Sequence, residues 1–102
     1  MARKIIWTST AIVDVNEISR FISRDSEYYA KRTVDRIHEV AQSLTEFPFS
    51  SRVVPEYGRD DIREVFVYDY RLMYRVTEQS IYIVAVIHVA RDISDWSEAE
   101  LN

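Results

Sequence analysis

The sequence predicts an α+β domain in which an N-terminal strand and an antiparallel helical hairpin pack on a twisted antiparallel sheet of three to four strands. Two stretches with helical spacing of apolar residues occupy the first half of the chain, and three β-prone runs joined by short connections occupy the second half. At 102 residues and 47% apolar composition, the chain suits one hydrophobic core. Residues 1–102 are therefore predicted to form a single domain.

The first half begins with the short β-prone run "KIIW" (residues 4–7), and "TST" after it offers hydroxyl groups that can cap a following helix. Apolar residues then recur at helical spacing twice, with Asp25 and Ser26 as a cap between the two stretches, and Pro48 ends the second. The predicted buried stripes are Ala11, Val15, Ile18 and Ile22, then Ala30, Val34, Ile37, Ala41 and Leu44. Because almost no linker separates them, the two helices should form an antiparallel hairpin.

The second half opens with "SSRVVPEYGRDD", which mixes a short strand-like piece with Pro55 and Gly58 and suggests an edge segment followed by a loop. Three β-prone runs follow, at residues 62–68, 70–76 and 81–89. Their connections are short enough for antiparallel hairpins. The last run is nearly all apolar, so we expect it to be central in the sheet.

The middle run divides its side chains between two faces, because successive residues of a strand point to opposite sides. One face carries Tyr70, Leu72, Tyr74 and Val76, and the other carries Arg71, Met73 and Arg75. We expect the first face to pack on the helices. The second face is predicted to be open to solvent or to a partner.

Composition excludes several kinds of site. The chain has no cysteine and only two histidines, His38 and His88, so neither a metal nor another cofactor is expected. The N-terminal segment lacks the apolar core of a signal peptide, and no apolar run approaches the roughly 20 residues that span a bilayer. A soluble, cytoplasmic protein without membrane contact is the expectation.

The charge distribution is uneven along the chain. The formal net charge is −4, from 13 basic and 17 acidic residues. Four of the acidic residues lie in the C-terminal tail, residues 92–102, which contains no base, so residues 1–91 sum to zero. A neutral body does not suggest a protein that holds many phosphates, which would need a surplus of cations.

Several motifs in this order, "WTSTAIVDV", "FPFSSRVVPE", "IREVFVYDYRLMYRV" and "VIHVARD", resemble the RelE/ParE superfamily of toxins from type II toxin–antitoxin systems. The resemblance covers nearly the whole chain. It implies a growth-arresting toxin that a cognate antitoxin neutralises in a hetero-oligomeric complex. Members similar to RelE cleave messenger RNA on the ribosome, whereas members similar to ParE inhibit DNA gyrase without cutting RNA.

The resemblance to RelE implies, if the chain is a ribonuclease, that Arg71 and Arg91 take cationic catalytic positions, with Glu64 and His88 as a possible base and acid. The chain departs from that pattern, because Ile62 and Glu64 stand where lysines are usual and no tyrosine follows Arg91. No catalytic residue is therefore expected, and gyrase inhibition by a ParE-like toxin is favoured. RNA cleavage on the ribosome and an inactive protein that only binds its antitoxin remain the alternatives.

The pattern "RE" before "YRxxY", with a histidine three residues before "RD", favours the ParE branch. One departure is that Val89 and Ala90 follow His88 where a glycine is common. The residues predicted to bind the target or a partner are Arg63, Tyr70, Arg71, Arg75, His88, Arg91 and Trp96.

Structural roles compete with these assignments. The structural alternative for Arg71 and Arg75 is a solvated sheet face on which they pair with Glu64 or Glu78, and this alternative is favoured for Arg75. Trp96 is interpreted as a side chain that pins the acidic tail to the body. His88 at a strand end is more often held by a nearby carbonyl than catalytic. Tyr28 and Tyr29, at a predicted helix start, are expected to be exposed and available to a partner.

Overall fold

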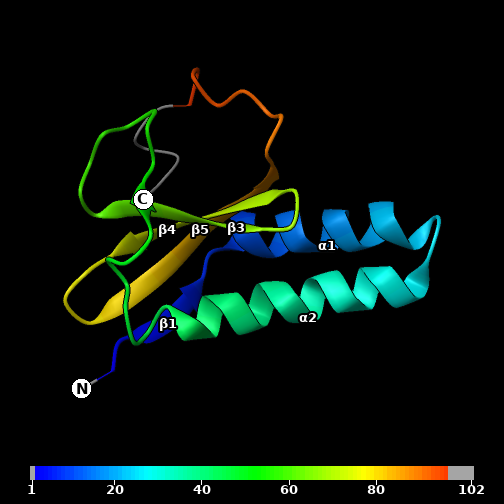
Figure 1. Ribbon diagram of the computed structural model, residues 1–102, viewed down its shortest axis with the longest axis horizontal. Helices are drawn as coiled ribbons and strands as arrows, with labels where there is room; N and C mark the ends of the chain where they lie inside the picture. Colours follow the sequence, from blue (N-terminus) through cyan, green and yellow to red (C-terminus); the bar gives the residue numbers. More distant parts are fainter. Residues whose placement is uncertain (1, 97–102) are drawn as a thin grey trace.

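The computed structural model describes residues 2–96 and confirms the α+β class. A short strand and two helices precede four further strands (Figure 1). The elements are β1 (Lys4–Trp7), α1 (Ser9–Ser23), α2 (Glu27–Ser43), β2 (Arg52–Val53), β3 (Ile62–Val67), β4 (Tyr70–Val76) and β5 (Ser80–His88). No described helix is long and apolar enough to cross a membrane.

The sheet has five strands in the order β1-β5-β4-β3-β2, and it is mixed rather than purely antiparallel. β2 to β5 form antiparallel neighbours, but β1 runs parallel to β5, with Lys4 opposite Ser80 and Trp7 opposite Ile83. The four antiparallel strands β2 to β5 agree with the predicted sheet of three to four strands, whereas the parallel pairing of β1 with β5 was not predicted. The run "KIIW" contains no signal for its pairing direction, which depends on where the later strands place the open edge of β5.

Side-chain hydroxyl groups begin both helices. The Thr8 Oγ1 accepts a hydrogen bond from Ala11 N at 3.2 Å and donates one to the Ile83 carbonyl oxygen at 2.8 Å. The Ser26 Oγ accepts from Tyr29 N at 3.1 Å at the start of α2. These bonds satisfy amides that have no partner inside their helices. Thr8 therefore caps α1 and ties its N-terminus to β5 at once.

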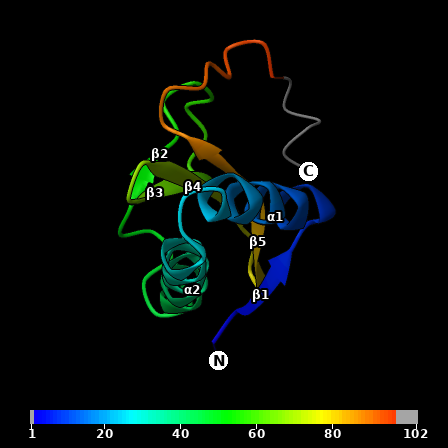
Figure 2. The same cartoon turned by 90° about the vertical axis from the view of Figure 1, so that its right-hand side faces the viewer.

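The two helices lie side by side and antiparallel, and they cover one face of the sheet (Figures 1 and 2). The apolar stripes that the sequence predicts face the sheet and build the larger core, together with one set of alternating strand residues. Its buried members are Ala11, Val15, Ile18, Ile37, Ala41, Leu44, Val67, Leu72, Tyr74, Val76, Ile81, Ile83 and Val86.

The opposite face of the sheet is also covered, contrary to the expectation that it would be open. A second core lies there beneath the loop between β2 and β3 and the segment after β5, drawn in green and orange away from the helical hairpin (Figure 2). Its buried members are Val54, Ile62, Met73, Val84, Ala85, Ile87 and Ile93. Alternation in β4 predicted which side chains share this face, but alternation alone cannot show that distant loops fold over it.

A β-bulge interrupts the pairing of β4 with β5. Met73 lies opposite Ala85 and Tyr74 opposite Ile83, so Val84 is the extra residue on β5. A bulge bends and twists its strand. Because β1 ends opposite Ile83, the part of β5 beyond the bulge has no neighbouring strand on the β1 side. An open strand edge therefore faces α1 in this region.

We predict that Thr8→Ala lowers the free energy of unfolding by about 1–2 kcal/mol, because it removes a helix cap. The substitution also deletes the hydroxyl bond to Ile83. Thr10→Ala, at an exposed position of the same helix, is the control and should change the free energy much less. Urea unfolding of both variants measures the difference, and equal losses would contradict the assigned role of Thr8.

Candidate functional site

The structure separates the predicted site residues into three groups. Tyr70, His88 and Arg91 line one pocket. Arg71 and Glu64 lie in a buried ion network on the other face of the sheet. The remaining residues, Arg63, Arg75 and Trp96, make separate contacts away from that network.

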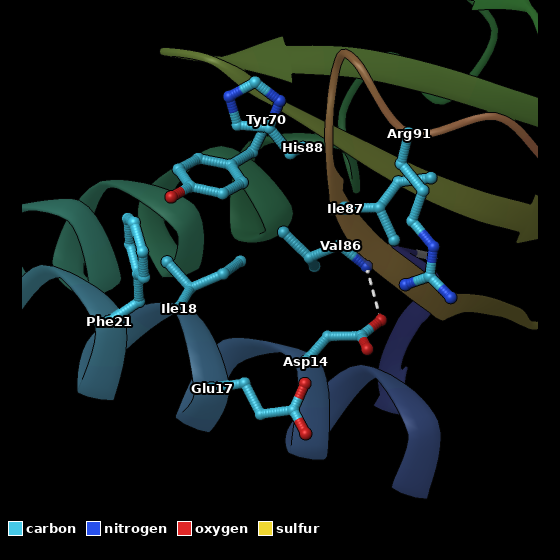
Figure 3. Close-up of a pocket in the computed structure, with 9 residues that line it drawn as sticks. All are labelled: Asp14, Glu17, Ile18, Phe21, Tyr70, Val86, Ile87, His88 and Arg91. Atoms are coloured by element: carbon cyan, nitrogen blue, oxygen red, sulfur yellow. Dashed lines mark hydrogen bonds between the residues drawn. The ribbon is translucent and has the colours of Figure 1, made fainter.

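The pocket has a volume of about 360 Å³ and lies between α1 and the ends of β4 and β5 (Figure 3). Ile18, Val86 and Ile87 form its apolar wall. Aromatic side chains stand at one end of the pocket, and charged side chains gather toward the other (Figure 3). The full lining is Asp14, Glu17, Ile18, Phe21, Tyr70, Val86, Ile87, His88 and Arg91.

The Asp14 carboxylate pairs a backbone amide at the open edge of β5. Its Oδ2 accepts a hydrogen bond from Val86 N at 2.9 Å, so the carboxylate pairs an amide that no neighbouring strand reaches (Figure 3). Burial raises the pKa of Asp14 above 3.8, while the Val86 amide and the charge of Arg91 act in the opposite direction. Asp14 thus fixes α1 against β5 and also brings a carboxyl with a raised pKa to the pocket.

Tyr70 and His88 face each other across the last pair of β4 and β5 residues. Their rings meet edge to face, with centroids 5.8 Å apart and an interplanar angle of 85°. The His88 Nδ1 accepts a hydrogen bond from Ala90 N at 3.0 Å, which assigns the remaining proton of a neutral ring to Nε2. Burial, with the charge of Asp69, raises the pKa of Tyr70.

Arg91 lines the pocket from the segment that follows β5. Its backbone amide donates to the His88 carbonyl oxygen at 3.0 Å, and its guanidinium lies 5.1 Å from the centre of the Trp96 ring. Trp96 in turn packs against the second core, as the interpretation of a pinning residue expects. The rest of the acidic tail, including Glu98 and Glu100, lies outside the described residues.

Arg71 is enclosed by carboxylates. Its Nε donates to Glu64 Oε1 at 2.7 Å, and its two terminal nitrogens form a bidentate pair with Glu56 at 2.8 Å each. Arg71 is 5% exposed and Glu64 is 1% exposed. Arg52 also pairs with Glu64 from the edge strand. The pKa of Arg71 is raised because Glu56 and Glu64 stabilise its charged form.

The pairing of Arg71 with Glu64 agrees with the structural alternative for this arginine, but its face of β4 is buried and not solvated. The guanidinium holds the loop that carries Glu56 against the sheet, and its planar donors are already used by carboxylates. Glu56 has a lowered pKa because it accepts these bonds. In this arrangement, Arg71 does not present a free cation to a phosphate.

Arg63 and Arg75 are also engaged. Arg63 donates to the Asp60 carboxylate at 2.7 Å and to backbone carbonyl groups of residues 49, 51 and 60. The Arg75 guanidinium lies 4.9 Å from the centre of the Tyr82 ring, and its buried Nε has no hydrogen-bond partner within residues 2–96. The interpretation that Arg75 pairs with Glu64 or Glu78 was therefore wrong, since an aromatic ring takes the place of a carboxylate.

Sequence reasoning did not assign Asp14, Glu17 and Phe21 to the site. They come from α1, whose predicted role rested only on the buried stripe that faces the sheet. Their spacing of three and four residues places them on one side of the helix, beside that stripe. This spacing was a usable signal, but only the packing of α1 beside β5 shows that the three residues line the same pocket as His88.

Comparison with known proteins agrees with the fold and the motifs. The sequence profile of the ParE toxin of type II toxin–antitoxin systems, parDE, matches residues 5–93. The toxin RelE2 of Caulobacter vibrioides is 32% identical over 88 residues, which cover 86% of this chain and 97% of that protein. The chain belongs to the ParE toxin family of type II toxin–antitoxin systems.

Solved structures share this fold at lower sequence identity. A chain of the chromosomal ParDE toxin–antitoxin system from P. aeruginosa superposes with a TM-score of 0.70 at 18% identity, covering 85% of this chain and 96% of that one. The YoeB dimer from Staphylococcus aureus gives a TM-score of 0.60 at 15% identity, covering 86% of this chain and 98% of that one. At these identities the likeness shows the fold alone.

We predict that Arg71→Met lowers the free energy of unfolding by about 3–5 kcal/mol, because it removes the buried cation that pairs with the buried Glu64 and leaves only the half-exposed Arg52. The double variant Arg71→Met, Glu64→Leu should recover most of this loss. Arg36→Met, which breaks the exposed pair with Glu39, should cost about 0–1 kcal/mol. Urea unfolding tests all three, and a double variant as unstable as Arg71→Met would contradict the ion-network account.

A second prediction concerns the pH dependence that Asp14 contributes. A carboxyl whose pKa is raised by folding contributes stability that is fully present below its unfolded pKa and is lost as pH rises through the folded pKa. In Asp14→Asn the amide oxygen still accepts from Val86, but the side chain cannot ionise. The free energy of unfolding of the wild type minus that of Asp14→Asn should therefore fall as pH rises above about 4.

Urea unfolding between mildly acidic and neutral pH measures this difference. Asp14→Ala is the companion variant, because it leaves the Val86 amide without its acceptor and should cost about 1–3 kcal/mol across the range. A difference between wild type and Asp14→Asn that rises with pH would refute the assigned direction.

Proposed function

We propose that this toxin arrests growth by binding and inhibiting DNA gyrase, without cutting RNA. The observation that carries the proposal is the enclosure of Arg71 by Glu56 and Glu64. Cleavage of RNA through its 2′-hydroxyl group requires cations at the reacting phosphate. The arginine that a ribonuclease of this superfamily would use is occupied, and a carboxylate stands where a lysine is usual.

The character of the pocket supports the same proposal. Asp14 and Glu17 place two carboxylates beside Arg91, which is an unfavourable environment for a phosphodiester. Phe21 is 65% exposed at the rim, and apolar residues form the wall. Exposed aromatic residues beside a concave apolar surface are typical of protein interfaces. A side chain of a protein target therefore suits the pocket better than an RNA backbone does.

A second candidate function has an observation in its favour. Tyr70, His88 and Arg91 converge on one pocket with Asp14, whose pKa is raised. A histidine, a carboxyl and a cation are the groups that acid–base cleavage of RNA uses. Under this alternative, cleavage depends on His88 and Arg91 and not on Arg71. An inactive toxin that only binds its antitoxin is the third possibility to be separated by experiment.

The experiment is pulse labelling of cells induced to make the toxin alone, comparing early incorporation into DNA and into protein. Gyrase inhibition predicts that DNA synthesis falls first. Loss of translation first would favour RNA cleavage, and no loss of either would favour the inactive binder. Co-expression of the cognate antitoxin should restore incorporation in the first two cases.

Purified gyrase provides the residue-level test. We predict that Phe21→Ala raises the toxin concentration needed to inhibit supercoiling by at least about tenfold, because an aromatic anchor is lost from the pocket rim. Phe47→Ala is the matched control, since Phe47 is equally exposed but lies in the connection after α2, outside the pocket lining. Equal effects of the two variants would contradict a target site at the pocket.

A further inference from the structure

The turn between β3 and β4 holds an exposed tyrosine in a strained backbone conformation. Tyr68 has φ 52°, in the left-handed region, and is the only non-glycine residue of the described chain with positive φ. Its side chain is 60% exposed, so burial in the core does not compensate the strain. Glycine or asparagine would fit this backbone more easily. Local folding therefore does not explain an aromatic side chain here.

Tyr68 stands over the middle of α2 and borders two hollows. One, of about 350 Å³, is lined by Tyr29, Arg32, Thr33 and Tyr68. The other, of about 250 Å³, is lined by Arg32, Asp35, Arg36, Glu39 and Tyr68. Because Arg32 and Tyr68 line both, the hollows adjoin along the outer side of α2. Tyr28, Tyr29, Arg32 and Tyr68 are called the tyrosine–arginine surface below.

Arg32 is the charged centre of this surface. Its guanidinium lies 5.7 Å from the centre of the Tyr28 ring and donates to the Tyr28 hydroxyl oxygen at 3.1 Å, and it lines both hollows together with Tyr68. The Tyr28 phenol thus holds the guanidinium, and the Tyr68 phenol of the β3–β4 turn lies beside it. Tyr29 adds a further exposed ring, 5.3 Å from that of Tyr28.

Arg32 differs from its basic neighbours on α2 in its partners. Lys31 pairs with Asp35 at 2.8 Å and Arg36 pairs with Glu39 at 3.3 Å. Among the described residues, no carboxylate forms a salt bridge with Arg32. Within residues 2–96, the surface therefore carries one positioned cation that forms no salt bridge and lies beside tyrosine rings. Tyrosine and arginine are the residue types enriched at the centres of protein interfaces.

We propose that the tyrosine–arginine surface binds an acidic segment of the cognate antitoxin, with a carboxylate of that segment on Arg32 and its flanking apolar atoms on Tyr28, Tyr29 and Tyr68. The proposal rests on the antitoxin that membership in this toxin family implies. A single unpaired cation matches one carboxylate. A nucleic acid would need several cations, and Asp35 and Glu39 beside this surface would repel it.

The tyrosine–arginine surface lies close in sequence to the pocket, so a segment bound there can affect how the toxin meets its target. Tyr68 precedes Tyr70 by two residues, and Tyr70 lines the pocket that we assign to the target. A segment bound at Tyr68 therefore lies beside that pocket and obstructs a large protein that approaches it. Neutralisation then follows from steric exclusion, without a change in the toxin backbone.

Calorimetric titration of the toxin with the purified antitoxin tests the proposal. Arg32→Glu should weaken the affinity by at least about tenfold, as expected for a charged residue at an interface centre. Lys31→Glu makes the same change of charge on the adjacent residue and should alter the affinity by less than about threefold. Equal losses in the two variants would show general charge attraction and overturn the proposal.

Tyr68→Gly separates binding from folding. It removes the ring and relieves the strained backbone, so Tm should stay the same or rise while the affinity for the antitoxin falls at least about fivefold. Unchanged affinity would also overturn the proposal. For Arg32→Glu, changing the antitoxin carboxylates to lysine one at a time should restore binding at one position, and restoration at none would refute the predicted ion pair.

These titrations contain no gyrase. Failure of the wild-type toxin to inhibit gyrase would therefore refute the proposed function and leave the result for this surface intact, whereas loss of the predicted affinity changes would refute the surface alone.

Discussion

Burial of β5 on both faces is the constraint on which the rest of the structure depends. From Ser80 to Ile87 every residue except Tyr82 is buried. A strand without a polar face needs a layer on each side of its sheet. The helical hairpin supplies one layer, and the loop before β3 with the segment after β5 supplies the other. Both faces of the described sheet are therefore covered around β5.

The second layer determines what happens to Arg71. A guanidinium on a covered face loses its water and needs carboxylates in return. Glu64 from β3 and Glu56 from the covering loop supply them, so the charge becomes part of the link between loop and sheet. Arg71, the residue of the motif that most resembles a catalytic arginine, therefore has a structural role.

Both candidate surfaces lie where the two layers end. The pocket forms beyond the bulge at Val84. There β5 no longer pairs with β1, and the Asp14 carboxylate of α1 accepts the hydrogen bond of its Val86 amide. The tyrosine–arginine surface forms where the β3–β4 turn meets α2. These are positions at which packing no longer dictates every side chain, so polar and aromatic residues can be exposed for binding.

Sequence periodicity alone identified both helices, the last three strands and the division of β4 into two faces. These features depend on neighbours close in sequence, and "TST" and Ser26 marked the helix starts for the same reason. The order of motifs also identified the toxin superfamily. The sequence did not reveal the parallel pairing of β1, the cover over Arg71, or the pocket that Phe21 and Asp14 line together with His88. Each of these joins segments far apart in the chain, and their contact depends on how two layers close around β5, which only the tertiary structure decides.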